Sequence, residues 1–406
     1  MAERTKRIAT VLAALLFPGQ PASAQDFSAQ GYLDLRLVEP AGEPSWIEGG
    51  LGKLRWGDGA DVVTPSAALN LHAQLGSEWL ASASLQAQPD SHAAVETLEA
   101  WLRYRPVSTS PWRWSLRAGA FFPPISLEND GVGWSMPAGI TPSAINSWIG
   151  EELRSTGVEW RVEHRAMPRT ISAGITVFGG NDPAGEILAA RGWSLSDRYH
   201  GFGSRLREPD ISARNAPPPR DFDPFVENDH TVGWHAYIDI DSRSQGRWRA
   251  MYYDNRTDPT TFREHDGEHV YSWHTRFWSI GHQRELGGMT LTVQGMLGDT
   301  VFKPAPNVLS TTEFWSGFVS LARSRGAWRP MIRFEQFGTR ETPDGDNAAH
   351  EHGNAITAAL IWRPAPRWRV SAEWLRVDSS RTTRPEAGFP ESVTDHQTQL
   401  SLRWFF

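Results

Sequence analysis

The sequence lacks cysteine, is poor in lysine and contains no long hydrophobic run. Its 406 residues include no Cys, which excludes disulfides and thiol chemistry. Lysine occurs only at Lys6, Lys53 and Lys303, and the formal net charge is −7. This acidic balance argues against a nucleic-acid partner, which favours basic surfaces. Beyond the first 24 residues no apolar run approaches the ~20 residues of a membrane helix, so a helical membrane protein is excluded.

The first 24 residues have the pattern of a signal peptide. A basic start that includes Arg4 and Arg7 precedes a short apolar stretch at 8–17, and Ala22-Ser23-Ala24 supplies small residues for a cleavage site. We expect residues 1–24 to be removed, which leaves 25–406 as one secreted domain. The removed part carries three basic residues and one acidic residue, so the remaining chain has a formal net charge of −9.

The remaining chain alternates apolar and polar residues with the period of two that is typical of β-strands. Segments 69–75, 158–162, 171–177 and 368–374 show this most clearly, and the connections between such segments alternate between short and long. The pattern predicts an all-β chain that forms a transmembrane antiparallel β-barrel with short periplasmic turns. Sixteen strand cores are predicted, at 30–38, 65–75, 79–88, 95–105, 112–122, 152–164, 169–179, 230–242, 247–255, 270–284, 289–301, 311–323, 328–337, 353–363, 367–377 and 395–406. The apolar segment 51–56 is assigned to a loop; if it were a strand, the count would fail.

Tryptophan is abundant, with 20 residues, and much of it lies beside the predicted short turns. Outer-membrane barrels place aromatic side chains in girdles at the two interfaces between lipid and water. The alternative is a soluble β-sandwich with a Trp-rich core, but a sandwich has no reason to collect Trp at one end of its strands. The predicted periplasmic girdle comprises Trp79, Trp112, Trp248, Trp328, Trp362, Trp368 and Trp404.

The chain ends in a strand whose last residue is Phe406, with Leu402 and Trp404 on the same face. This resembles the C-terminal signal that the barrel-assembly machinery of the bacterial outer membrane recognises. The alternative is an ordinary edge strand that happens to end in Phe. Together with the signal peptide, the pattern predicts location in the bacterial outer membrane, with lipid and lipopolysaccharide as surroundings.

Residues 116–129 (LRAGAFFPPISLEN), 140–146 (ITPSAIN) and 150–152 (GEE) resemble proteobacterial porins, and distantly the phosphate-selective porin O/P group. In that group a strand with Arg-x-Gly-x-Phe runs into a Pro-Phe-Gly-Leu-Glu-like loop. The resemblance implies passive diffusion of small hydrophilic solutes or ions through a water-filled pore. It departs in its lack of lumen lysines, so phosphate selectivity is not implied. The transported solute is left open, as is the choice between a monomer and a homotrimer.

Two long connections are expected to matter for function. Segment 123–151 is predicted to fold into the barrel as a constriction loop, with Glu128 and Asp130 facing Arg36 and Arg117 across the pore; the alternative is an ordinary external loop. Segment 180–229 is predicted to be an extracellular loop that covers the mouth or contacts a neighbour.

In each predicted strand the apolar positions should face lipid, so the charged side chains at the alternating polar positions are expected to face the lumen. Charge rings of this kind set the ion preference of a channel. The alternative is that the arginines form wall-stabilising ion pairs with Glu99, Glu159, Glu163, Glu335 and Glu373, and we expect both roles. The predicted lumen set comprises Arg36, Arg103, Arg117, Glu159, Arg161, Arg333, Arg369 and Arg403.

Other functions find less support in the sequence. Imidazole and carboxylate groups in two loop clusters could ligate a divalent ion, but neither cluster has the spacing of a known site, and no metal or other cofactor is predicted. A hydrolase would need a nucleophile elbow or a Ser partner for His235 or His274, and neither is found in the sequence. An adhesive or structural barrel that uses its long loops is the second hypothesis. The loop clusters contain His265, His269, His350 and His352.

Overall fold

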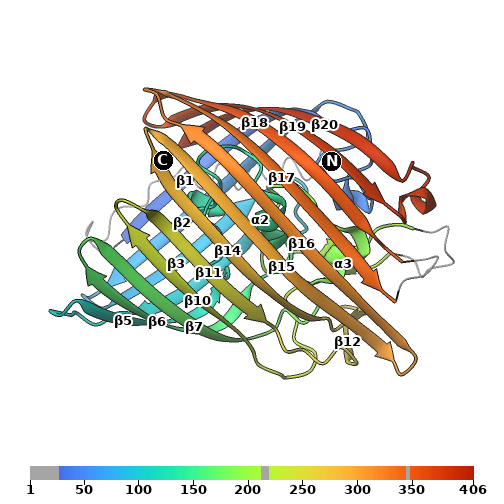
Figure 1. Cartoon of the computed structure of the whole chain (residues 1–406), viewed down its shortest axis with the longest axis horizontal. Helices are drawn as coiled ribbons and strands as arrows, with labels where there is room; N and C mark the ends of the chain where they lie inside the picture. The colour runs from blue at the N-terminus through green and yellow to red at the C-terminus, as the bar shows by residue number, and fades with distance from the viewer. Residues whose placement is uncertain (1–26, 212–218, 344–347) are drawn as a thin grey trace.

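In a computed structural model, described for residues 27–211, 219–343 and 348–406, sixteen antiparallel strands close into one barrel (Figure 1). Each predicted strand core corresponds to one barrel strand, and segment 51–56 forms none of them. The predicted signal peptide lies outside the described residues. The barrel strands are β1 (Phe27–Glu39), β2 (Val62–Leu75), β3 (Trp79–Ala87), β4 (Glu96–Tyr104), β5 (Trp112–Phe121), β6 (Ser155–Ala166), β7 (Arg169–Gly179), β10 (Gly233–Ser242), β11 (Gly246–Asp254), β14 (His274–Leu286), β15 (Met289–Ala305), β16 (Val308–Arg323), β17 (Trp328–Thr342), β18 (Glu351–Ala365), β19 (Trp368–Arg381) and β20 (Ser392–Phe405).

The first and last strands close the barrel. β1 pairs with β20 from Tyr32 opposite Phe405 to Glu39 opposite Thr398. Beyond this ladder, Gly31 and Phe406 exchange two main-chain hydrogen bonds of 3.1 and 3.0 Å. A side chain at position 31 would collide with the Phe406 ring and with the Ala68 carbonyl, so this seam requires glycine. Closure leaves no open sheet edge, as a barrel in lipid requires.

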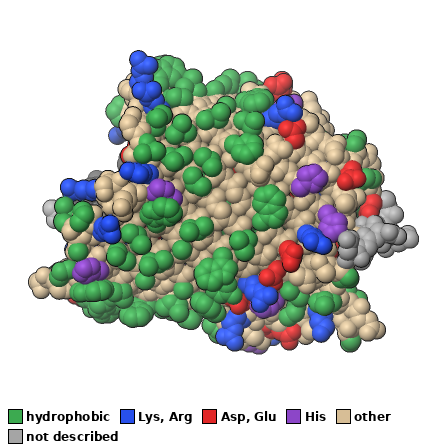
Figure 2. Space-filling view, in the orientation of Figure 1, with side chains coloured by type: hydrophobic (Ala, Val, Ile, Leu, Met, Phe, Trp, Pro, Cys, Tyr) green, Lys and Arg blue, Asp and Glu red, His purple; other side chains and the backbone are tan. Residues whose placement is uncertain are grey.

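The outer face of the barrel is apolar, as strand parity predicts. The predicted girdle residues are exposed there, from 39% at Trp362 to 58% at Trp112, except that Trp404 is half-buried. In Figure 2 hydrophobic side chains spread over the visible wall, and charged side chains lie mainly toward its two ends. No helix among the described residues is long and apolar enough to cross a membrane. The wall therefore presents a lipid-compatible band made by strands.

Three long connections carry additional elements and fold back toward the barrel interior. We refer to them as the β1–β2 segment (40–61), the β5–β6 segment (122–154) and the β7–β10 segment (180–232). They contain η1 (Trp46–Glu48), η2 (Val132–Trp134), α2 (Ala144–Glu152), α3 (Glu186–Arg191), β8 (Leu206–Arg207) and β9 (Asp221–Phe222). Elsewhere β12 (Phe262–His265) and β13 (Glu268–Tyr271) form a small hairpin, and η4 (Arg384–Ala387) precedes β20.

Candidate functional site

The β5–β6 segment contacts lumen-facing side chains around the whole wall. Near its start, the carbonyl of Leu127 accepts a hydrogen bond of 2.9 Å from Gln283 on β14. Further along, the Gly133 amide donates 3.1 Å to Asn70 on β2. The segment then reaches β17 and β19 before α2 returns it to β6, and α2 is visible within the barrel in Figure 1. These contacts lie on the inner face of the wall, and the role of 123–151 as a constriction stays a prediction.

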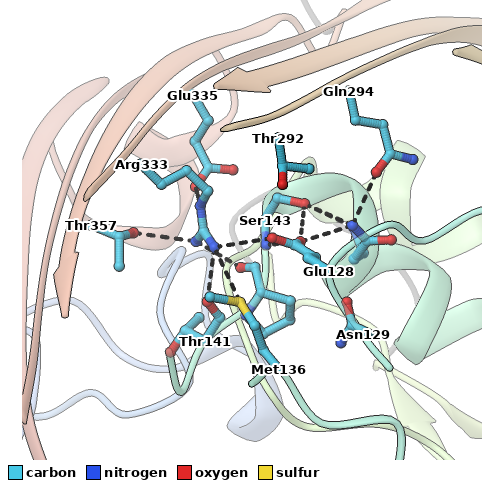
Figure 3. A network of polar contacts seen from close by, with 12 residues as sticks. Glu128, Asn129, Met136, Thr141, Ser143, Thr292, Gln294, Arg333, Glu335 and Thr357 are labelled. Atoms are coloured by element: carbon cyan, nitrogen blue, oxygen red, sulfur yellow. Dashed lines mark hydrogen bonds and ion pairs between the residues drawn. The ribbon is translucent and has the colours of Figure 1, made fainter. Parts of the chain in front are cut away.

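Arg333 on β17 holds the turn before α2 (Figure 3). Its guanidinium donates to the carbonyls of Thr141 at 3.0 Å and Pro142 at 2.9 Å. It also bonds Glu335 at 2.8 Å and lies 3.5 Å from Glu128. The Arg333 side chain is fully buried. A buried guanidinium needs this many acceptors, because an unpaired charge away from water is costly.

Carboxylates on the wall complete the attachment. Glu335 accepts a hydrogen bond of 2.7 Å from the Ala144 amide, the first residue of α2. Glu373 accepts from the amides of Ile140 at 2.6 Å and Thr141 at 3.0 Å. Each wall carboxylate thus satisfies main-chain donors that would otherwise be orphaned at membrane depth.

Helix α2 is buried on all sides, which suits its position inside the barrel. Ser143 caps it by accepting from the Asn146 amide. Trp148 packs at 5.1 Å from Phe314 and 5.4 Å from Phe277, both lumen-facing wall residues. Trp193 of the β7–β10 segment adds a further ring at 5.9 Å. Such a short helix is marginal alone, so this aromatic packing holds it.

The first part of the β7–β10 segment is not external, although its length predicted an extracellular loop. Residues 181–200 are buried except for the half-buried Ala190, because α3 and the residues after it enter the barrel. Arg191 of α3 bonds Glu151 of α2 at 2.6 Å. This part of the segment therefore packs on α2 and fills the lumen on the side of the long connections.

The β1–β2 segment joins the same buried cluster through Lys53. Its ammonium lies 2.5 Å from Glu351 on β18 and donates to the Arg191 carbonyl at 2.9 Å. Sequence reasoning missed Lys53, Arg191 and Glu351. The signal that could have revealed the infolding is the apolar content of 187–195, unusual for an external loop.

The predicted lumen arginines divide into two groups. Those on β1, β17, β19 and β20 face the lumen but are covered by the infolded segments, so they do not line open water. Arg36, for example, pairs with Asp34 at 2.9 Å and with Asp197 of the β7–β10 segment at 2.6 Å. This covered group comprises Arg36, Arg333, Arg369 and Arg403, each 4% exposed or less.

The second group lies on β4, β5 and β6 and stays partly exposed. Arg117 pairs with Glu159 at 2.9 Å, and Arg161 with Glu163 at 3.3 Å, as the wall-stabilising interpretation expects. Arg103 stands directly opposite Arg117 in the β4–β5 register. All three arginines are half-buried, so their side chains are less covered than those of the first group.

For Glu128 the predicted opposition to Arg36 and Arg117 is wrong. Glu128 is 8% exposed and accepts from the amide and hydroxyl of Ser143 at 2.7 and 2.6 Å. Its cationic neighbour is Arg333, on the opposite wall. The alternation along the strands predicts which side chains face inward, but it does not predict which of them the β5–β6 segment contacts. Asp130 is exposed.

The metal and catalytic candidates lie as follows. His265 bonds the Asn228 amide oxygen at 3.1 Å, and His269 lies opposite Glu264 in the hairpin. The four loop histidines lie outside the one acidic cluster with metal-like spacing found in the described part of the chain, Asp182, Glu227 and Asp229. The His350 ring nitrogen accepts from the Glu341 amide at 3.3 Å, whereas His352 is exposed on β18.

His235 does have a serine partner, contrary to the sequence reading. Its Nε2 lies 3.0 Å from Ser155 Oγ, and both residues are fully buried in the lumen. Its Nδ1 has no hydrogen-bond partner among the described residues. Without a carboxylate to orient the ring, the pair does not make a catalytic triad.

A closed sixteen-stranded antiparallel barrel with an apolar outer band, aromatic girdles and infolded connections defines the porin-type class of bacterial outer-membrane barrel. No protein-family model matches the chain, and no curated protein sequence matches it. Solved structures do. The outer-membrane channel DcaP of Acinetobacter baumannii aligns with a TM-score of 0.53 at 9% identity, over 96% of this chain and 100% of that one.

Two further barrels are similar to the same extent. OmpF of Salmonella typhi, solved with daunomycin, gives a TM-score of 0.53 at 11% identity over 94% of this chain and 97% of that one. A loop-deletion form of OmpT, an outer-membrane protein of Vibrio cholerae, gives 0.53 at 9% identity over 94% and 99%. At these identities the likeness establishes the fold: this chain has the sixteen-stranded barrel fold of the porins.

Proposed function

We propose that the protein is an outer-membrane channel for passive diffusion of small hydrophilic solutes, with a passage much narrower than that of a general porin. The observation that carries this is the β5–β6 segment, which runs through the lumen and is bonded to the wall by Arg333, Glu335 and Glu373. We propose segment 123–151 as the constriction. The finer resemblance to the phosphate-selective porin O/P group stays a prediction.

Single-channel recording in a planar bilayer tests the proposal. We expect unitary events of small conductance from the wild type. Replacing 183–226 by a short Gly-Ser linker removes the upper packing and should raise the conductance several-fold. Glu351→Gln, which weakens the attachment of Lys53 and Arg381, is a milder variant that keeps every segment. Folded protein, verified by heat-modifiable migration, that never conducts in any variant would overturn the proposal.

The buried lumen favours one second candidate, a structural or adhesive barrel. Because the inward faces of β1, β17, β19 and β20 are covered, a barrel that conducts nothing is consistent with the same packing. The recording separates the two functions, since an adhesive barrel stays silent when the segments are loosened.

We also propose lipid and lipopolysaccharide contacts, and a homotrimer joined through the outer face of β2 to β4. OmpT of Vibrio cholerae has been solved in a trimer form, with a TM-score of 0.51 to this chain. Here the outer surface of these strands includes four alanines among larger side chains such as Leu71 and Leu102, and the walls of two copies would approach most closely at these alanines. Cross-strand neighbours on this patch are Ala73 with Ala81 and Ala83 with Ala100.

A further inference from the structure

Three segments from different parts of the chain meet in a pocket of about 420 Å³ at the end of the barrel opposite the short turns. The β1–β2 segment contributes Trp46, Ile47 and Glu48, and the β3–β4 connection contributes Asp90 and His92. The remaining lining residues, His200, Arg205, Arg207 and Asp221, belong to the β7–β10 segment. The pocket thus lies above the packed lumen, where a solute from outside arrives first.

The floor of the pocket is formed by the buried side chains of Trp46 and His200. Trp46 is 3% exposed, and the Arg191 guanidinium covers its ring at 4.2 Å from the centroid. His200 lies 5.9 Å from the same ring. Burial lowers the pKa of His200 well below its ordinary value, and the charge of Arg198 adds to this, so the imidazole is uncharged. Asp90 is anchored by Arg55 at 2.9 Å.

The wall of the pocket alternates acceptors and donors. Arg207 meets Asp221 only at 3.4 Å, a long pair with both side chains more than a third exposed. Arg205 turns toward Asp266 at 2.7 Å. Glu48 is exposed and faces the same space. The whole pocket is lined by the carboxylates of Glu48, Asp90 and Asp221 and by two guanidinium groups, so it has no cationic excess that would select an anion.

This arrangement suits a ligand that both donates and accepts hydrogen bonds without carrying net charge. Carboxylates only accept and guanidinium groups only donate, so a ring of hydroxyl groups can satisfy both at once. The volume lies in the range of small-ligand sites, roughly 300–1,000 Å³. We propose that this pocket binds a neutral polyhydroxylated solute, a mono- or disaccharide, before it enters the channel. The inference rests on the proposed function and names its substrate class.

Isothermal titration of the folded barrel in detergent tests the site without requiring conduction. Glucose, maltose, sucrose and trehalose are titrated, with glycine and inorganic phosphate as competing classes. We expect saturable binding of at least one saccharide. The double variant Glu48→Gln/Arg207→Gln should weaken it tenfold or more, because it removes one charged acceptor and one charged donor from the pocket wall.

The matched control is Arg263→Gln/Glu264→Gln on the exposed β12–β13 hairpin, which makes the same charge changes outside the pocket and should leave binding unchanged. Binding of glycine or phosphate but no saccharide would overturn the assignment, as would saccharide binding that the pocket variant leaves intact. A barrel that binds sugar but never conducts refutes the channel and keeps the site. A barrel that conducts but binds no sugar refutes the saccharide site and keeps the channel.

Discussion

Single buried charges decide how the interior of this barrel is held. Arg333 is bonded to two main-chain carbonyls, to Glu335 and to Thr357 at 3.2 Å, and it lies beside Glu128. Removing one partner of such a network leaves the others buried without compensation. The lumen arginines are therefore structural anchors as much as electrostatic features of a pore.

Arg333→Ala should destabilise the barrel by about 3–5 kcal/mol, because Glu335 and Glu128 would stay buried without their cation. The measurement is urea-induced unfolding in detergent micelles followed by tryptophan fluorescence. Arg376→Ala removes the exposed pair with Asp378 on the outer wall and should cost less than about 1 kcal/mol. Equal effects of the two variants would contradict the anchoring role of Arg333.

Glu128 and Asp130 lie two residues apart but should give opposite phenotypes. Asp130 is exposed and interacts electrostatically with Arg247, so Asp130→Asn should shift the zero-current potential toward anion selectivity with little change in stability. Glu128 is bonded to Ser143, Asn146 and Arg333, so Glu128→Gln should lower stability and leave selectivity nearly unchanged. A tenfold salt gradient across the bilayer measures the potential. An unchanged potential for Asp130→Asn would place that residue outside the ion path.

At the scale of elements, the terminal strand combines two roles that the structure separates. The main chain of Phe406 closes the seam with Gly31, whereas its ring lies over the glycine on the outer side. The resemblance to the assembly signal rests on the aromatic side chain of Phe406. Closure of the seam depends on the main-chain hydrogen bonds of Phe406.

Phe406→Ser keeps both main-chain bonds and removes the ring, whereas deletion of Phe406 removes both features. We expect each change to lower the amount of barrel in the outer membrane several-fold, measured by immunoblot of membrane fractions. Phe389→Ala in the connection before β20 serves as the control and should leave the amount unchanged. If only the deletion lowers the amount, the seam bonds and not the terminal aromatic ring are responsible.

The width of the barrel explains why the long segments fold inward. Each strand residue that points into the lumen needs a partner, and a barrel of sixteen strands is wide enough to require filling or water. Here Leu188, Trp193 and Leu195 of the β7–β10 segment supply apolar filling beside Trp148. This apolar filling explains why the lumen is packed where the β7–β10 segment enters it.

For the whole molecule, the alanines on the outer face of β2 to β4 predict how copies of the chain associate. The native barrel in detergent should have the mass of three chains by light scattering and should resist SDS until boiled. Ala83→Trp should shift it to the monomer, because a large ring on the patch separates the walls. Val293→Trp, on the exposed outer face of β15, is the control and should keep the trimer. A monomeric wild type would refute the proposed assembly.

The fold was predictable from local pattern, and the interior was not. Alternation along each strand records which side meets lipid and which meets the lumen, so the sixteen strands, the outward tryptophans and the inward parity of Arg36 or Glu373 follow from neighbours in sequence. What fills the lumen depends on pairs far apart along the chain, such as Arg36 with Asp197 and Glu128 with Arg333. No periodicity encodes such pairs. Closure of the barrel brings them within reach, and desolvation then allows only the arrangements in which every buried charge finds a partner.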